Sequence, residues 1–343
     1  MKRIIAAALL LMLAMLLAAC AAELPAPIPD GAPGHASQDI GLTTDGQRVY
    51  LLRQGATLRS WSFTFSAYEV TGGGMRRIVS GRDANDFTVA EGRLLIVSHT
   101  ANWLKAAWDS AEIDGYDALT GGNVLHASVR YEGGINPDRY TFYIAGTQVI
   151  RSWRMYKPDG KRWEEFAFVD AQGHAGEPFW TLPGFLRVKV LEGGILTADY
   201  KASEVRLFDL NGMKEYTVPA MWGTDPFGDP LLPDGVLLEG VMYYPAADGV
   251  RAYDLAARQD SLFAAVTAPE YFYVTGGQLY TVADDGLLTA FDLCTGAASP
   301  TTITLTKADR YIIAGASAYI LQKPELHGVR QTGCRIEGLW EAE

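Results

Sequence analysis

The chain has 343 residues, of which 48% are hydrophobic and 20% are charged. This composition excludes an intrinsically disordered chain and a coiled coil. Forty acidic residues against 29 basic ones give a formal net charge of −11, so binding to nucleic acid through its phosphates is not expected. Length alone does not decide between one domain and two, because all-β barrels and propellers reach about 250 residues or more as single units.

The N-terminus has the features of an export signal. Lys2 and Arg3 precede an unbroken apolar run over residues 4–19, which is shorter than the about 20 residues of a membrane-spanning helix. The run ends in Leu17-Ala18-Ala19-Cys20, which resembles the lipobox of bacterial lipoproteins. The resemblance implies cleavage before Cys20 and a diacylglycerol thioether on its sulfur, with palmitate among the acyl chains. The alternative is an ordinary signal peptide with an incidental cysteine.

These features predict three segments: a signal peptide over residues 1–19, the lipidated cysteine and a tether over residues 20–38, and a folded domain over residues 39–343. The tether cannot form a regular helix or pair as a strand, because proline recurs in it at positions 25, 27, 29 and 33. Removal of the signal peptide takes away two positive charges and leaves a net charge of −13.

The residue after the lipidated cysteine indicates where the anchor is expected. Cys20 is followed by Ala21 rather than by an aspartate. By the usual sorting preference of lipoproteins, we therefore expect the periplasmic face of the outer membrane if the host envelope has two membranes. In either kind of envelope the protein faces outside the cytoplasm.

After the tether, short β-rich runs alternate with Gly, Asp and Asn, and a 3.6-residue period is almost absent. One unit, an aromatic residue followed by aspartate and an apolar residue, recurs at residues 116–119, 208–211, 253–256 and 291–294. The gap between the first two copies has room for another, which we assign to residues 156–160. Residues 68–72 and the pair Thr332-Gly333 bring the number of copies to seven.

Each unit lies within a recurring series of short strands. Before it comes an alternating strand and a tight turn such as Asp284-Asp285-Gly286, and after it a Thr-Gly or Asn-Gly turn and a further strand. Four strands in about 40 to 45 residues are typical of a propeller blade. The sequence therefore predicts an all-β fold, a seven-bladed β-propeller of four-stranded antiparallel blades. A β-solenoid or a two-sheet sandwich is the alternative, although a sandwich does not repeat its turn motif seven times.

Two copies carry a family resemblance. Residues 279–296 and 116–121 resemble the repeat of the pyrroloquinoline-quinone-like propellers, which implies that fold for residues from about 40 to 343. In quinoprotein alcohol dehydrogenases the repeat ends in a tryptophan that packs between blades. Here Ala290, Asp292, Thr295 and Gly296 match, but Pro300 occupies the tryptophan position. The adjacent-cysteine pair of many of those enzymes is also missing. We therefore expect the fold without the quinone.

The sequence contains no recognisable cofactor or metal motif. The histidines occur singly, without the spacing of metal ligands, at positions 35, 99, 126, 174 and 327. One aspartate per blade is expected to accept backbone N–H bonds within its own turn, at positions 117, 209, 254 and 292. A catalytic ring of these carboxylates is the less favoured interpretation.

Long aromatic loops are the candidate binding elements. In a four-stranded blade, the loops from strand two to strand three and from one blade to the next converge on one face. We assign residues 99–108, 170–180 and 221–230 to that face, and expect a short helix over residues 103–111. The candidate binding residues are Trp103, Trp108, His174, Trp180, Trp222 and Asp225. The alternative is that the tryptophans seal the blades from above.

The sequence thus predicts a lipid-anchored propeller outside the cytoplasm that is a binding or assembly scaffold for a protein or glycan partner. The alternative is an envelope enzyme, such as a lactonase, a glycan lyase or a quinone-dependent dehydrogenase, with its site at the channel mouth.

The last blade, from about residue 309, is short, so we expect residues 40–42 to pair with it and latch the ring.

Cys294 and Cys334 are the two cysteines left once Cys20 is lipidated. An oxidising compartment favours a disulfide between them, whereas their positions on turns of neighbouring blades favour two free thiols.

Overall fold

The computed structural model describes residues 37–56, 63–71, 74–82, 84, 86–102, 107–130, 139–156, 161–170, 172–184, 186–199, 204–219, 231–306, 310–321 and 334–340. The chain divides into two compact units, Met1–His35 and Ala36–Glu343. The predicted signal peptide, Cys20 and almost all of the tether lie outside the described residues. In the described part no helix occurs, and so none that is long and apolar enough to cross a membrane.

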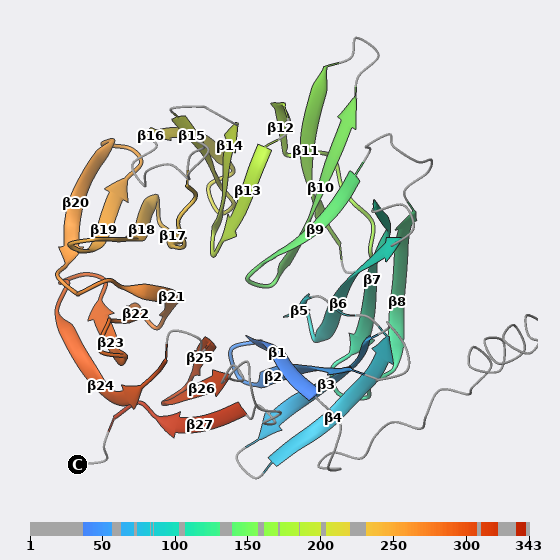
Figure 1. Ribbon diagram of the computed structural model, residues 1–343, viewed down its shortest axis with the longest axis horizontal. Coiled ribbons are helices and arrows are strands. Elements are labelled where there is room, and N and C mark those ends of the chain that lie inside the picture. Colours follow the sequence, from blue (N-terminus) through green and yellow to red (C-terminus); the bar gives the residue numbers. More distant parts are fainter. Residues whose placement is uncertain are drawn as a thin grey trace, which may run out of the picture. The chain divides into compact units, whose positions relative to one another are not determined.

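The described residues of the second unit form 27 strands in seven antiparallel sheets, arranged as the blades of a ring (Figure 1). Blade 1 consists of β1 (Ser37–Thr44), β2 (Val49–Ala56), β3 (Phe63–Thr71) and β4 (Gly74–Arg82), and blade 2 of β5 (Asp86–Ala90), β6 (Arg93–Asn102), β7 (Ala107–Asp117) and β8 (Asn123–Arg130). Blade 3 consists of β9 (Arg139–Ala145), β10 (Gln148–Tyr156), β11 (Arg162–Val169) and β12 (Trp180–Pro183), and blade 4 of β13 (Leu186–Leu191), β14 (Gly194–Asp199), β15 (Glu204–Asp209) and β16 (Lys214–Pro219). Blade 5 consists of β17 (Val236–Leu238), β18 (Val241–Ala246), β19 (Gly249–Asp254) and β20 (Gln259–Ala264), and blade 6 of β21 (Glu270–Thr275), β22 (Gln278–Val282), β23 (Leu287–Asp292) and β24 (Ala298–Thr304). Blade 7 consists of β25 (Arg310–Ala314), β26 (Ser317–Leu321) and β27 (Cys334–Gly338).

The first strand of each blade lies at the centre of the ring. β1 contacts both β5 and β25, β9 contacts β5 and β13, and β21 contacts β17 and β25, as Figure 1 also shows. Strands two, three and four follow outward in chain order. The predicted seven-bladed propeller of antiparallel blades is confirmed. Blade 7 differs from the other six in having three strands within the described residues.

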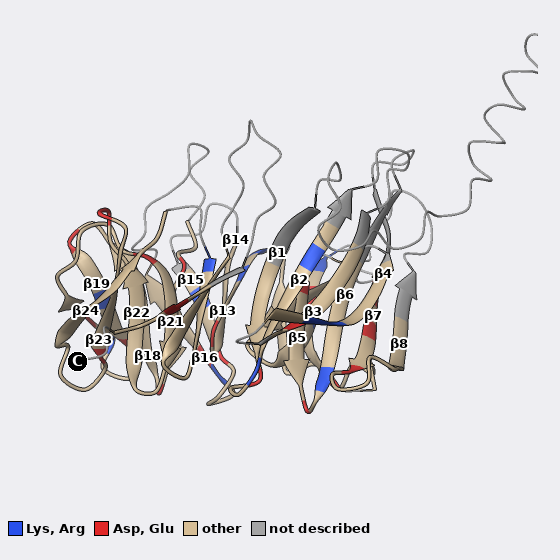
Figure 2. Cartoon of the chain, turned by 90° about the horizontal axis from the view of Figure 1, so that it is seen from below, with Lys and Arg blue, Asp and Glu red and all other residues tan. Residues whose placement is uncertain are grey.

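Antiparallel order gives the ring two different faces. The turns between strands one and two and between strands three and four lie on one face, which we name the turn face. The connections between strands two and three, and from one blade to the next, lie on the other, which we name the loop face. Figure 2 shows the blades edge-on between these two faces.

Within the described residues, blades 1 and 7 meet by side-chain packing and share no strand. Residues 40–42 lie in β1, where Gly41 and Leu42 pair with Leu52 and Leu51 of β2. Blade 1 then packs against blade 7 through an apolar cluster made up of Val49, Leu51, Tyr68, Val70, Ile312 and Leu321. The expected latch, in which residues 40–42 would pair into blade 7, is wrong because this segment is needed as the central strand of blade 1.

The repeated aspartates have the structural role predicted for them. Each of Asp117, Asp209, Asp254 and Asp292 ends a third strand and accepts the backbone N–H groups of the residues two and three positions later. Asp209, for example, accepts those of Asn211 at 2.9 Å and Gly212 at 3.0 Å. Such side-chain turns fix the exit of the third strand without the help of a ligand.

In blade 3 the structure corrects the position of the repeat. Tyr156 ends the second strand, β10, so residues 156–160 are not the equivalent of the other units. The equivalent aspartate is Asp170, directly after the third strand, which accepts N–H groups of Gln172 at 2.9 Å and His174 at 2.8 Å. In blade 7, Thr332-Gly333 lies outside the described residues and precedes the third strand instead of following it.

The turn after Asp117 rests on the preceding blade. Gly121 has φ +73°, and a Cβ atom there would lie 2.2 Å from the carbonyl oxygen of Ile78 on β4. From the same strand, Arg76 donates to the carbonyl oxygens of Leu119 at 2.8 Å and Ala118 at 3.2 Å. Blade-to-blade contact therefore relies on glycine at a close backbone approach. The thiol of Cys294, in the equivalent turn of blade 6, is free and exposed.

Candidate binding sites

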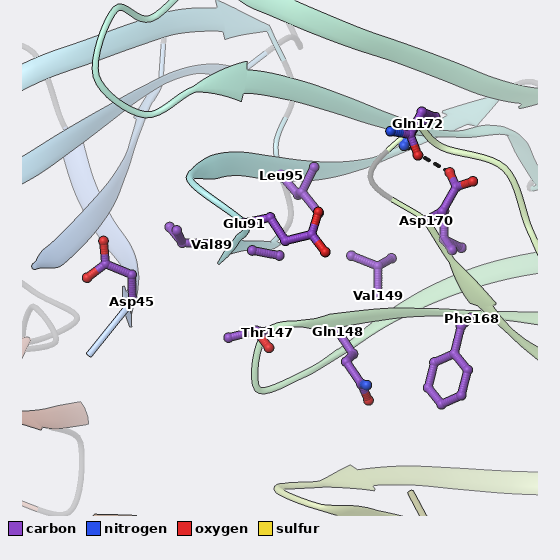
Figure 3. A pocket seen from close by; sticks show the side chains of 12 residues that line it. Asp45, Val89, Glu91, Leu95, Thr147, Gln148, Val149, Phe168, Asp170 and Gln172 are labelled. Carbon is purple, nitrogen blue, oxygen red and sulfur yellow. Dashed lines mark hydrogen bonds between the residues drawn. The ribbon is translucent and has the colours of Figure 1, made fainter. Parts of the chain in front are cut away.

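A pocket of about 470 Å³ opens on the turn face, between turns of blades 1, 2 and 3 (Figure 3). Its apolar lining includes Val89, Leu95, Val149 and Phe168. Its polar lining comes from turn residues and includes Asp45, Glu91, Thr147, Gln148, Asp170 and Gln172. None of its lining residues is a lysine or an arginine. The pocket therefore offers hydrogen-bond acceptors beside an apolar surface.

Two of the three carboxylates in this pocket hold their own turns. Asp45 accepts the N–H groups of Gln47 at 2.9 Å and Arg48 at 2.7 Å, and the hydroxyl of Tyr50 at 3.0 Å. Partial burial opposes ionisation of Asp45, but these hydrogen bonds outweigh it and lower its pKa. The pKa of Asp170 is lowered mainly by the backbone N–H of His174.

Glu91 is the third carboxylate and differs from the other two. It begins the turn between β5 and β6 with φ +50°, and Figure 3 shows its side chain directed into the space near Leu95 and Val149. Asp45, Glu192 and Glu239 stand at the same place in blades 1, 4 and 5, each followed by glycine. This acidic-glycine pair of the first turn is a repeated sequence signal that the aromatic-aspartate unit does not include.

A second pocket, of about 720 Å³, is formed by connections of the loop face. Its walls come from residues 231–234, 244–247 and 268–270. The chain enters β21 there with two non-glycine residues at positive φ, Ala268 at +43° and Tyr271 at +55°. Positive φ is unusual for side chains of these types and keeps this segment locally strained.

A hydrogen-bonded ion pair lies in this second pocket. The Tyr244 hydroxyl donates to Asp260 at 2.7 Å, and Arg251 donates from Nε to Asp260 and from Nη1 to Asp248, both at 2.7 Å. Burial, then the bond to Asp260, raises the pKa of Tyr244, and hydrogen bonding to Asp260 raises that of Arg251. Both pKa values move further above 7, so neither group is prepared for proton transfer at pH 7.

Trp180 is a core residue of the ring. Its side chain is only 4% exposed and packs against Phe166 and Phe208, with ring centroids 5.3 and 5.1 Å away. Its indole Nε1 donates to Glu215 Oε2 at 2.9 Å. Because Phe166 belongs to blade 3 and Phe208 to blade 4, Trp180 seals the boundary between two blades. The structure thus places it inside the ring and not on a binding surface.

His174 is exposed but lies on the face opposite to the one expected. Residues 170–179 connect the third strand of blade 3, β11, to the fourth, β12, so this segment belongs to the turn face. The assignment of all three long segments to one face is wrong here, because the misplaced repeat in blade 3 shifted the strand numbering by one. His174 Nδ1 lies 3.5 Å from Asp170 Oδ2.

The remaining candidates are only partly described. Trp103, Trp222 and Asp225 lie outside the described residues, as does the side chain of Trp108. The backbone of Trp108 pairs with Ala101, and Ala107 pairs with Asn102. Residues 107–111 are therefore strand and not part of the expected helix, because β6 and β7 continue as a long hairpin toward the loop face.

Two carboxylates at the centre of the ring have raised pKa values. Desolvation raises the pKa of Asp86 despite the nearby charge of Arg310, and it raises that of Glu192 despite a hydrogen bond from the Val274 backbone. Asp86 begins a central strand and Glu192 follows the end of one. At about 3.3 Å per residue, the strand separates them by roughly 15 Å along the channel. They are thus not arranged as an acid–base pair. Among the described residues no group of three or more acidic, His or Cys side chains could hold a metal ion.

The fold makes this chain a seven-bladed β-propeller. No family model and no curated protein matches its sequence. Solved structures similar to it include the β-propeller domain of the Trilobed protease from Pyrococcus furiosus, described as having an open velcro topology. That match has a TM-score of 0.52 and 11% identity, over 90% of this chain and 96% of that one.

Two further structures are similar in the same way. Acylaminoacyl peptidase from Pyrococcus horikoshii matches with a TM-score of 0.55 and 10% identity, over 90% of this chain and 52% of that one. KlHsv2, with its loop 6CD replaced by a Gly-Ser linker, matches with a TM-score of 0.50 and 11% identity, over 83% and 89%. At such low identity the likeness extends to the propeller fold alone.

Proposed function

We propose that this protein is a lipid-anchored propeller on the outer side of the cytoplasmic membrane, or at the periplasmic face of an outer membrane, and that it is a binding or assembly scaffold. Cys20 carries the anchor. The partner is a protein or a glycan of the envelope, and it binds the loop face.

Polar side chains of the described residues are engaged in structural contacts within the ring, and this observation carries the proposal. The repeated aspartates hold turns, and the Arg251–Asp260 pair with Tyr244 is internally satisfied. The two carboxylates with raised pKa values are far apart along the channel. This arrangement supports a rigid platform that presents loops more than it supports proton-transfer chemistry.

The second pocket supports the loop face as the binding side. It is the larger of the two described above, and its walls combine exposed Leu231 and three prolines with the carboxylates of Asp234, Asp260 and Glu270. Residues 221–230, with Trp222 and Asp225, directly precede Leu231 in the sequence. Apolar surface bordered by fixed polar groups is typical of recognition sites.

Substitution on the loop face tests the proposal. Trp108→Ala and Trp222→Ala should each reduce recovery of the envelope partner at least about tenfold in pull-downs from solubilised membranes, as binding tryptophans typically contribute about 2 kcal/mol or more. Leu262→Ala is the matched control, because Leu262 is an exposed apolar residue on an outer strand, β20. Unchanged recovery with both tryptophan variants, while they remain folded, would contradict the proposal.

A further inference from the structure

The pocket on the turn face has the size and the apolar surface of a small-molecule site. Its volume of about 470 Å³ lies within the range of about 300–1,000 Å³ that is typical of ligand pockets. The core residues Val89, Leu95 and Val149 form part of its lining. Phe168 and Val169 are only half-buried and leave apolar surface open to the pocket. A ligand that fills this space therefore needs an apolar body.

The charges around the pocket are all of one sign. Asp45, Glu91 and Asp170 come from turns of blades 1, 2 and 3, and no lysine or arginine is among the lining residues. Figure 3 shows Glu91 in the middle of the lining, with Asp45 and Asp170 on either side. Because the pKa values of Asp45 and Asp170 are lowered, both carboxylates remain ionised at neutral pH. The pocket thus attracts a cation and repels an anion.

Glu91 is the carboxylate that is open to a ligand. Asp45 and Asp170 accept backbone N–H groups of their own turns. Glu91 is exposed, and among the described residues its carboxylate forms no hydrogen bond or ion pair. A cationic donor at Glu91 would form a charge-assisted hydrogen bond without displacing an existing one.

The spacing of the carboxylates favours an organic cation over a metal ion. A calcium or magnesium ion needs several oxygen ligands at about 2.0–2.6 Å. No three acidic, His or Cys side chains within the described part of the chain lie close enough together to hold a metal. An organic cation needs only one carboxylate for its charged group, and its apolar body would cover the surface of Phe168 and Val169.

We propose that the turn-face pocket binds a small organic cation, whose primary ammonium group donates to Glu91 and whose apolar body packs against Phe168 and Val169. Asp45 and Asp170 strengthen the attraction through their charge and do not need to contact the ligand. The site lies on the face opposite to the proposed partner surface and does not depend on it.

Titration calorimetry with 2-phenylethylamine tests this site on the full chain in a non-ionic detergent at pH 7. The probe joins an aromatic body to an ammonium group that is protonated at this pH, as alkylammonium groups titrate near pH 10. We expect saturable binding that Glu91→Gln weakens about fivefold or more, because the amide keeps the shape of the side chain and removes its charge.

The matched control is Glu239→Gln. Glu239 begins the equivalent turn of blade 5 with φ +48°, close to the +50° of Glu91, and is followed by glycine in the same way. It lines neither of the two pockets described above. The control variant should therefore bind the amine as the parent does, and both variants should keep the melting temperature of the parent.

Two uncharged or oppositely charged analogues separate the ammonium group from the apolar body. 2-Phenylethanol and 3-phenylpropionate should bind at least about tenfold more weakly than the amine. Absence of saturable binding, equal binding of the alcohol, or equal affinity of the Glu91→Gln variant and the parent would overturn the proposal. Displacement of the amine by an equal concentration of Mg²⁺ would assign the pocket to a metal instead. Trp222→Ala should leave amine binding unchanged, so this test and that of the loop face fail independently.

Discussion

Oδ1 of Asp292 lies 2.7 Å from Oγ1 of Thr295 and also accepts the Thr295 backbone N–H at 2.8 Å. The same arrangement recurs in blade 2, where Asp117 accepts the hydroxyl and the backbone N–H of Thr120 at 2.8 and 2.7 Å. These bonds lower the pKa of both aspartates. The carboxylate is thus a structural part of the repeat, and its charge contributes to the turn.

Asp292→Ala should lower the melting temperature by a few degrees, because three donors lose their acceptor. Asp292→Asn keeps one acceptor oxygen and should cost less. Since the pKa of Asp292 is lower in the folded state, its contribution is full above about pH 5 and is lost as the pH falls below about 4. Thermal unfolding between pH 3 and pH 7 checks this. An alanine variant as stable as the parent at neutral pH would refute the structural role.

Gly121→Ala should destabilise the ring by about 3 kcal/mol or more, because the new Cβ would meet Ile78 O at 2.2 Å in a left-handed conformation. Gly46→Ala is the control, since Gly46 also has positive φ but nothing lies within 4 Å of a built Cβ. It should cost only about 1 kcal/mol. Urea unfolding measures both variants, and equal losses would show that the contact between blades is unimportant.

Trp180→Ala should cost about 3–5 kcal/mol, as for other large aromatic residues removed from a core. Trp180→Phe keeps most of the packing but loses the donor to Glu215, and we expect about 1–2 kcal/mol. Both losses are measured by chemical denaturation. A fully stable Trp180→Ala variant that no longer binds its partner would instead return this residue to the set of binding side chains.

Cys20→Ser should abolish lipid attachment, because only the cysteine sulfur can form the thioether. The variant should appear in the soluble fraction, or remain unprocessed with residues 1–19 attached, as measured by membrane fractionation and intact mass. Cys294→Ser is the matched control and should stay with the membrane. A correctly cleaved Cys20→Ser variant that still fractionates with the membrane would exclude this anchor.

Local patterns in the sequence were enough to predict the architecture. The aromatic-aspartate units at 208–211, 253–256 and 291–294 predicted the ends of third strands, because an aspartate that accepts its own turn's N–H groups leaves a short, regular signal. The same kind of signal misled in blade 3. Tyr156-Lys157-Pro158-Asp159-Gly160 has the right residue types, and only strand pairing shows that Asp170 is the equivalent residue.

The sequence by itself therefore determined the repeat and the seven-bladed fold, and it predicts the lipid anchor, since each depends on residues close together in the chain. Tertiary structure decided what depends on distant residues. Trp180 became a core residue because Phe208 and Glu215, from the next blade, surround it. β1 stayed in blade 1 because β2 provides its hydrogen-bond partners, and the ring could close through apolar packing against blade 7. Burial and strand pairing between distant segments leave no short motif, so the pockets emerged only from the folded ring.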